Sequence, residues 1–557
     1  MGILISYERL EDNQLRVSFV TCQVLALLLS LVFRYVLSAG RVGVTARHVF
    51  AVVVGVYMAY FCHRWQVIHF FIQSTVCYII ILSSKPSNMH KYVFIFSMMY
   101  LTLCHIYRTY YNFGTYTLDF TGPLMIMTQK VTSLSCALHD GLYRDDSSLS
   151  PDQRKQAVRR IPSPLEYYSY MFYFVGVLAG PLTYYSDFKA WMEGTNLKPL
   201  IRIDEQGNEV VVIKEPSALG VVLKKATTAA FFGLTMLYVG PLFSARGNVD
   251  DLIIAAPLLT RFGYLHLSIM MARTKYYFAW TLADAVANAA GLGFNGYDKN
   301  GNPRWDLISN LNILKIEFAT SLKMLIDNWN IQTSLWLKRV CYDRAPYQPI
   351  LMVYILSATW HGFYPGYYFT FLGGAILTPA FRKMRQHLRH RFQGTARLRQ
   401  SYDIITFTST HFFLNYHVLP FVLLDWEPTI TFYRSLYFAI HIAVALVAVL
   451  LPYRKQSRPS NEVAIAKTNG VTPDMNGKVA ADRERNGTKT NNNKVENGVG
   501  GHRIQNGTIT ARRINLITDS AQKFGLGERI TNGMKGFSHA NYNGAKFAVS
   551  YVQKKES

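Results

Sequence analysis

One histidine stands in an apolar stretch where an ionisable side chain is unexpected. His361 belongs to the sequence Trp360-His361-Gly362-Phe363-Tyr364-Pro365-Gly366-Tyr367-Tyr368, inside the apolar run from residue 350 to residue 377. An ionisable ring at membrane depth costs free energy unless a partner or a water-filled cavity receives it, so it is a candidate for function. The glycines and the proline after it are expected to break the helix and expose backbone groups beside the ring. The simpler interpretation is a histidine that packs helices and bonds to a carbonyl.

An asparagine upstream of this histidine is the second candidate. Asn330 stands in the sequence Trp329-Asn330-Ile331-Gln332-Thr333-Ser334-Leu335-Trp336-Leu337, and Lys338, Arg339 and Arg344 follow it. Imidazole, with a pKa near 6.5, can accept the proton of a hydroxyl at neutral pH, and a neutral amide can donate to an oxyanion. The functional interpretation is that the Asn330 amide points into the same cavity as His361, open to the side marked by the three cations. The alternative is an ordinary amphipathic helix with a basic end.

The remaining histidines and the cysteines predict no further chemistry. Five histidines in or near apolar runs lack a broken helix beside them and are expected to pack helices: His69, His105, His411, His417 and His441. The six cysteines show no CxxC pair and no zinc-type spacing with histidine. We expect neither a disulfide framework, nor a thiol nucleophile, nor a metal site.

The elements that position these residues are predicted to be membrane helices. Half of the 557 residues are hydrophobic and 17% are charged, whereas soluble chains carry about a quarter charged residues. The apolar residues gather in runs near the length that crosses a bilayer, and we expect roughly ten to twelve membrane segments. Residues 307–325 follow a helical period with charges between the leucines, which predicts amphipathic interfacial helices around a central cavity. The expected fold is an all-α polytopic membrane protein.

The chain is expected to divide into a membrane-embedded core, residues 1–453, and a cytosolic tail, residues 454–557. Asn-Gly pairs recur through the basic tail, and this composition predicts disorder. Lys554 and Lys555 resemble the dilysine signal that returns membrane proteins to the endoplasmic reticulum. We therefore expect a multi-pass protein of that membrane, with a retrieval coat as a partner of the two lysines.

The net charge of +24 is concentrated in the tail and in residues 381–400, which we expect to form a loop between spans. The positive-inside rule places both on the cytosolic face, and attraction to anionic lipid head groups adds to this effect. No recognition module for nucleic acid accompanies the charge, so nucleic-acid binding is not expected.

Several sequence blocks resemble the membrane-bound O-acyltransferase family, specifically its lysophospholipid acyltransferase branch. The resemblance runs from about Asp119 to Leu377, and its most specific blocks are those of Trp329-Asn330 and Trp360-His361. The other blocks are Asp119-Phe120-Thr121-Gly122-Pro123, His139-Asp140-Gly141, Tyr170 through Gly180-Pro181 to Tyr184-Tyr185, Lys275-Tyr276-Tyr277, Gly291-Leu292-Gly293-Phe294-Asn295-Gly296, and Trp305-Asp306 with Asn310 and Glu317.

The resemblance implies a reaction and a site. The donor would be acyl-CoA with a fatty acyl chain, expected to be unsaturated, and the acceptor lysophosphatidylethanolamine, lysophosphatidylserine or lysophosphatidylcholine; no cofactor beyond this co-substrate is implied. His361 and Asn330 would be the catalytic residues. The implied substrate-binding residues are Trp329, Trp336, Trp360, Tyr364 and Tyr367.

Two other interpretations stay open at this point. A member of the same family could use a different acceptor, such as lysophosphatidylinositol, a neutral lipid, a sterol or a protein. A transporter would also explain the membrane segments and the buried histidine, but the chain shows no inverted internal repeat of the kind many transporters carry.

Overall fold

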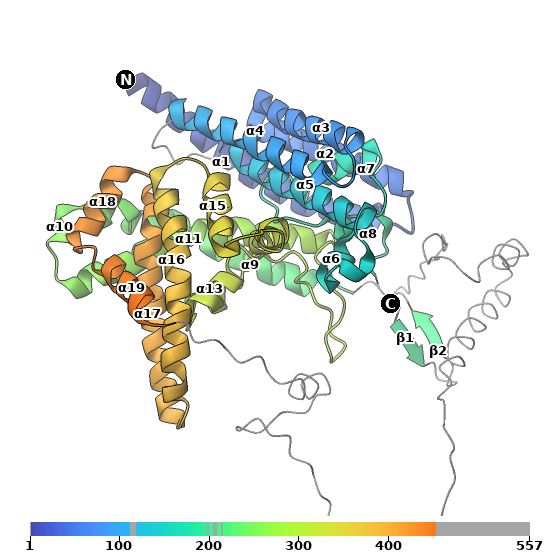
Figure 1. Ribbon diagram of the computed structural model, residues 1–557. Coiled ribbons are helices and arrows are strands. Elements are labelled where there is room, and N and C mark those ends of the chain that lie inside the picture. Colours follow the sequence, from blue (N-terminus) through green and yellow to red (C-terminus); the bar gives the residue numbers. More distant parts are fainter. Residues whose placement is uncertain (1, 112–118, 198–199, 204–208, 213–215, 453–557) are drawn as a thin grey trace, which may run out of the picture. The chain divides into compact units, whose positions relative to one another are not determined.

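A computed structural model of the protein describes residues 2–111, 119–197, 200–203, 209–212 and 216–452. Helices make up most of these residues, coloured from blue to orange along the chain in Figure 1. The helices of the N-terminal part are α1 Gly2–Leu31, α2 Val44–His63, α3 Ile68–Ser83, α4 Met89–Tyr111, α5 Thr121–Leu142, α6 Pro151–Gln156, α7 Pro164–Phe172 and α8 Tyr185–Glu193. The later helices are α9 Leu219–Leu234, α10 Asp251–Ile254, α11 Leu258–Ala289, α12 Ile313–Glu317, α13 Leu322–Asn328, α14 Ile331–Leu337, α15 Pro349–His361, α16 Pro365–Leu388, α17 Ala396–Leu423, α18 Trp426–Ser435 and α19 Ala439–Leu450.

One short antiparallel strand pair departs from the all-helical expectation. Strand β1, Leu200–Ile203, pairs with β2, Glu209–Val212, with Leu200 opposite Val212. Valine and isoleucine are enriched in strands because branched side chains fit a pleated surface. Strands of four residues are too short to be recognised among the long apolar blocks that predict membrane helices.

Three helical stretches among the described residues are long and apolar enough to cross a membrane: Gln14–Val36, Val44–Ser83 and Leu219–Val249. Helices α18 and α19 meet at an angle of 77° and would form a fourth span if counted together. Other helices bury charged side chains, such as Lys130 on α5 and Asp284 on α11, so they depend on protein contacts rather than on lipid. The total of roughly ten to twelve segments stays a prediction, and the tail, residues 454–557, lies outside the described residues.

Several of the N-terminal helices pack on α5. Helix α4 lies along α5, α3 contacts both, and α2 packs on α7 (Figure 1). Gly55 of α2 permits this last contact, since a Cβ there would come within 1.6 Å of the Phe172 carbonyl oxygen. Local sequence fixes where α7 begins, because Ser163 and Glu166 form a capping box and Pro164 fills the first helical position.

The later helices form a second set of contacts. Helix α11 packs along α9 and α17, and α16 packs along α15 and α17. Arg273 of α11 holds Glu317 of α12 through two hydrogen bonds of 3.0 and 2.8 Å, a bidentate geometry that fixes orientation. The expectation that residues 381–400 form a loop is wrong. Helix α16 continues to Leu388, a short 3-10 turn follows, and α17 begins at Ala396, because the stretch alternates apolar and basic residues at a helical spacing.

Candidate active site

The helix break predicted after His361 is present. His361 is the last residue of α15, and α16 begins at Pro365. Gly362 between them has a φ of +117°, a backbone conformation that residues other than glycine rarely adopt. The histidine is therefore held at a sharp turn between two helices and not in the middle of one span.

A backbone carbonyl determines which nitrogen of the His361 ring can act as a base. Nδ1 lies 2.7 Å from the carbonyl oxygen of Ser357, and since that oxygen can only accept, Nδ1 carries the hydrogen. In a neutral ring the other nitrogen, Nε2, then has the free lone pair. Among the described residues Nε2 has no hydrogen-bond partner. The ring is thus oriented as a proton acceptor through Nε2.

Aromatic rings from three helices surround this imidazole. Phe371 of α16 and Phe421 of α17 lie 4.7 and 5.3 Å from the ring centre, Trp360 lies 4.7 Å away, and Tyr367 lies 5.8 Å away. Such a shell excludes water and fixes the ring position. A neutral imidazole fits this environment without an ion partner.

His105 of α4 also contacts the turn that follows His361. Its Nε2 donates to the carbonyl oxygen of Trp360 at 3.1 Å, and a Cβ added at Gly362 would lie 3.3 Å from the His105 ring. The expectation that His105 is a buried packing histidine is confirmed, and its packing partner is the turn that carries His361.

Asn330 occupies a special backbone position at the start of α14. Its φ and ψ are 48° and 53°, the left-handed region, which asparagine tolerates better than most residues. Asn310 holds this turn. The backbone carbonyl of Asn310 accepts from the Ile331 N–H at 3.0 Å, its Oδ1 accepts from the Gln332 N–H at 3.0 Å, and its Nδ2 lies 3.0 Å from Oδ1 of Asn330.

These bonds determine the orientation of the Asn330 amide. An N–H can bond only to the oxygen of the Asn310 side chain, so the other atom of that amide is the NH₂ group. The Asn330 atom that faces it must be the accepting oxygen. The NH₂ group of Asn330 is then left to donate elsewhere, and Asn310, buried to 4% exposure, is the residue that orients it.

The predicted substrate-binding tryptophans lie in packed aromatic groups. Trp329 is partly exposed and contacts Tyr276 and Trp280 of α11 at 5.5 and 5.7 Å. Trp336 and Trp360 are buried and lie 5.5 Å apart. Both indoles are anchored on α5: that of Trp336 donates to the Thr132 hydroxyl at 2.9 Å and that of Trp360 to the Met125 carbonyl at 3.0 Å.

The remaining predicted residues of this group, Tyr364 and Tyr367, are buried beside Leu424 at the start of α16. Four of the five predicted substrate-binding residues are thus buried in the protein interior, and Trp329 is the partly exposed one. Their contact with substrate stays a prediction, as do the catalytic roles.

The Trp336–Trp360 contact connects the two candidate catalytic segments. Helix α14, which begins after Asn330, and helix α15, which ends at His361, meet through these rings and share α5 as a support. No hydrogen bond between the Asn330 and His361 side chains is present among the described residues. A cavity that holds both side chains stays a prediction.

The cations expected to mark the open side of the site are all paired. Lys338 binds Asp343 at 2.7 Å, Arg339 binds Asp152 through two hydrogen bonds, and Arg344 binds Asp140 at 2.7 Å. The Arg339 hydrogen bond lowers the pKa of Asp152 below its usual value. Arg339 and Arg344 therefore fix the continuation of α14 against α6 and α5, whereas the Lys338 pair lies within that continuation itself.

No group of three or more histidine, cysteine or acidic side chains in the described part of the chain is placed to hold a metal ion. The six cysteines are free thiols, five buried and Cys341 partly so. Of the histidines expected to pack helices, His69, His417 and His441 bond to a tyrosine or a carbonyl, whereas His411 is buried with no bond to either ring nitrogen within the described residues.

Known proteins resemble this chain over most of its length. The family described as MBOAT, membrane-bound O-acyltransferase family, matches residues 105–419. The chain is 47% identical over 449 residues to membrane-bound glycerophospholipid O-acyltransferase 2 of Rattus norvegicus, covering 80% of this chain and 86% of that protein. It is 44% identical over 456 residues to membrane-bound glycerophospholipid O-acyltransferase 1 of Mus musculus, covering 80% and 93%. It is 41% identical over 444 residues to lysophospholipid acyltransferase 6 of Drosophila melanogaster, covering 78% and 61%.

Proposed function

The chain belongs to the membrane-bound O-acyltransferase family, and we propose that it transfers a fatty acyl chain from acyl-CoA to the free hydroxyl of a lysophospholipid. The names of the relatives, glycerophospholipid O-acyltransferases and a lysophospholipid acyltransferase, support this acceptor class. The head groups that fit the sequence resemblance are ethanolamine, serine and choline. The reaction belongs to phospholipid remodelling.

The His361 ring carries the proposal, because its geometry supplies a base without an ion partner. The acceptor hydroxyl oxygen attacks the thioester carbonyl carbon while its proton passes to Nε2 of His361. The Ser357 carbonyl retains the Nδ1 hydrogen bond and stabilises the imidazolium that forms. Such general base catalysis contributes about 10²–10⁴-fold to the rate.

Asn330 is proposed as the donor to the oxyanion. The free NH₂ group left by the Asn310–Asn330 bond donates to the carbonyl oxygen as negative charge develops on it. Loss of one such donor costs about 10²–10³-fold in kcat. The tetrahedral intermediate then collapses, the carbon–sulfur bond breaks, and the CoA sulfur takes the proton from His361. The products are a diacyl phospholipid and CoA with a free thiol.

Microsomes that contain this protein test the proposal. They are expected to incorporate acyl chains from acyl-CoA into a lysophospholipid, and His361→Ala is expected to reduce the rate at least 100-fold at equal protein amount. His441→Ala is the matched control, since that ring also lies in an apolar helix but bonds to the Tyr416 hydroxyl at 3.0 Å. Near-normal turnover in a well-expressed His361→Ala protein would refute the role of this histidine.

The subcellular location is a separate part of the proposal. Lys554 and Lys555 match the position of a dilysine retrieval signal at the end of the chain. We propose that the enzyme resides in the endoplasmic reticulum membrane with a cytosolic C-terminus.

A further inference from the structure

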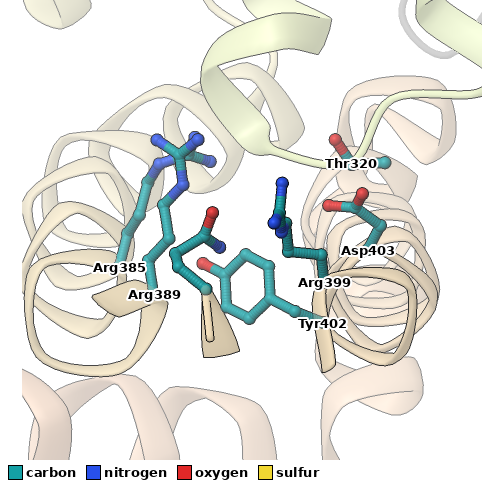
Figure 2. Close-up of a pocket in the computed structure, with 7 residues that line it drawn as sticks. Thr320, Arg385, Arg389, Arg399, Tyr402 and Asp403 are labelled. Carbon is teal, nitrogen blue, oxygen red and sulfur yellow. The ribbon is translucent and has the colours of Figure 1, made fainter. Parts of the chain in front are cut away.

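A cavity at the end of α16 is lined by three arginines from two helices and the turn between them. It holds about 240 Å³. Arg385 stands in the last turn of α16, Arg389 in the 3-10 turn, and Arg399 in the first turn of α17. Figure 2 shows Arg385 and Arg389 on one side of this space and Arg399 on the other, with the Tyr402 ring between them and Thr320 and Asp403 completing the wall.

The three arginine side chains that line this cavity are exposed to solvent. Among the described residues, none of the three arginines forms an ion pair. Lys338, Arg339 and Arg344, in contrast, each bind a carboxylate. Asp403 supplies one negative charge, and the three arginines and one aspartate leave a formal charge of +2. Solvent and salt weaken the repulsion among these exposed cations, and a bound anion would reduce it further.

The donors around the cavity are those that suit a phosphate group. Arginine offers a planar set of N–H donors that matches phosphate oxygens in a bidentate manner. The hydroxyls of Tyr402 and Thr320 add two neutral donors. Pockets for whole drug-sized ligands measure about 300–1,000 Å³, so this smaller space suits one head group.

The surroundings of the cavity favour a lipid as the source of that phosphate. Leu388, Leu398 and Ile405 are exposed on the same two helices, so apolar side chains alternate with the arginines. Basic and apolar side chains on one helical surface are typical of the membrane interface, where anionic head groups lie. We infer that the cavity binds the phosphate-bearing head group of an anionic membrane lipid.

This site is separate from the His361 turn. Helix α16 begins beside His361 at Pro365, and with a rise of about 1.5 Å per residue Arg385 lies roughly 30 Å along it. Thr320, however, stands between α12 and α13, and α13 leads directly to Trp329 and Asn330. A bound head group would therefore tie the α16–α17 pair to the segment that carries Asn330. This coupling, unlike the binding itself, rests on the proposed acyltransferase function.

The binding is tested with the purified full-length protein by native mass spectrometry during titration with phosphatidic acid and, separately, phosphatidylcholine. The pocket variant is Arg385→Gln/Arg389→Gln/Arg399→Gln. Its matched control replaces three exposed arginines of the same segment that do not line the cavity and removes equal charge: Arg382→Gln/Arg391→Gln/Arg397→Gln.

The expected result is a loss of at least tenfold in phosphatidic acid affinity for the pocket variant, with little change for the control. Asp403→Asn is expected to increase the affinity, because it removes the carboxylate that faces the phosphate. Equal losses in both triple variants would overturn the site in favour of diffuse attraction to the basic surface. Displacement of the lipid by micromolar inorganic pyrophosphate or free CoA would overturn the lipid assignment and indicate a soluble phosphate compound.

The coupling is tested by acyl transfer in nanodiscs of phosphatidylcholine with and without phosphatidic acid. Anionic lipid is expected to raise turnover several-fold in the wild-type and control proteins and to raise it less in the pocket variant. Equal stimulation of all three would overturn the coupling. A protein that binds the lipid but transfers no acyl chain in either membrane would instead contradict the proposed function and leave the binding site standing.

Discussion

Asn310 should act on the reaction only through Asn330, and a double-mutant cycle can show this. Asn310→Ala removes the two side-chain hydrogen bonds to the Asn330 turn and leaves the Gln332 N–H without its 3.0 Å partner. An unsatisfied buried donor costs about 1–3 kcal/mol of stability. The Asn330 amide would also become free to rotate, so its NH₂ group would face the oxyanion only part of the time.

The effect on kcat has an upper limit set by Asn330 itself. Loss of the whole donor costs about 10²–10³-fold, or roughly 2.7–4 kcal/mol, and loss of its orientation alone should cost less, on the order of 10–100-fold. Once Asn330 is alanine, Asn310 has no amide left to orient. The double variant should therefore be no slower than Asn330→Ala alone, a strongly non-additive result.

The assay is steady-state acyl transfer with both substrates varied, for the two single variants and the double variant. Asn248→Ala is the matched control for stability, because Asn248 is equally buried and its amide donates to Ser268 at 2.8 Å on helix α11, outside the site. It should lower the unfolding temperature with kcat unchanged. Additive losses in the double variant, or normal kcat in Asn310→Ala, would refute the orienting role.

Three further outcomes are expected. Asn330→Ala should lower kcat by about 2–4 kcal/mol of barrier with little change in KM, because a neutral donor gains most where negative charge develops; steady-state kinetics measure this, and a defect confined to KM would contradict it. Gly362→Ala should destabilise the protein by about 1–3 kcal/mol and reduce turnover, since its φ of +117° strains any other residue; unchanged thermal unfolding and kcat would show that the turn tolerates a side chain. Truncation at Arg454 should preserve specific activity in membranes, while replacement of Lys554 and Lys555 by serine should let some protein leave the endoplasmic reticulum; microscopy that shows an unchanged distribution would make the lysines incidental.

The sequence predicted the local features of the site better than its long-range contacts. The break after His361 followed from the backbone freedom of Gly362 and the restricted φ of Pro365, which both act within a few residues. The helical period over residues 307–325 predicted too much helix: only α12 and the start of α13 are helical there, and Leu311 instead forms an isolated β-bridge with Trp329. The helix break is encoded by neighbours in the chain and can be recognised without a tertiary structure, whereas the path of residues 307–325 depends on long-range contacts.

Contacts between distant segments could not be predicted in this way. His105 and Trp360 are bonded although they are far apart in the chain, and nothing in the sequence around His105 distinguishes it from the other buried histidines. Asn310 belonged to a recognised family block, but its bonds to the Asn330 turn depend on how residues 310 and 330 fold together. The ion pairs of Lys338, Arg339 and Arg344 could likewise not be predicted, because the sequence does not show which aspartates lie beside them in the fold.

The Ser357 carbonyl bond has a consequence for how the two substrates meet. Because Nδ1 is held by the backbone, we expect the ring to keep its orientation during a catalytic cycle. In the proposed mechanism Nε2 then both receives the proton from the hydroxyl and returns it to the departing sulfur. The acceptor oxygen and the donor sulfur must therefore lie together within hydrogen-bonding reach of one nitrogen, about 2.6–3.2 Å for oxygen. Both substrates have to be present before the first bond forms, so initial-rate plots should give intersecting lines and not the parallel lines of a ping-pong enzyme.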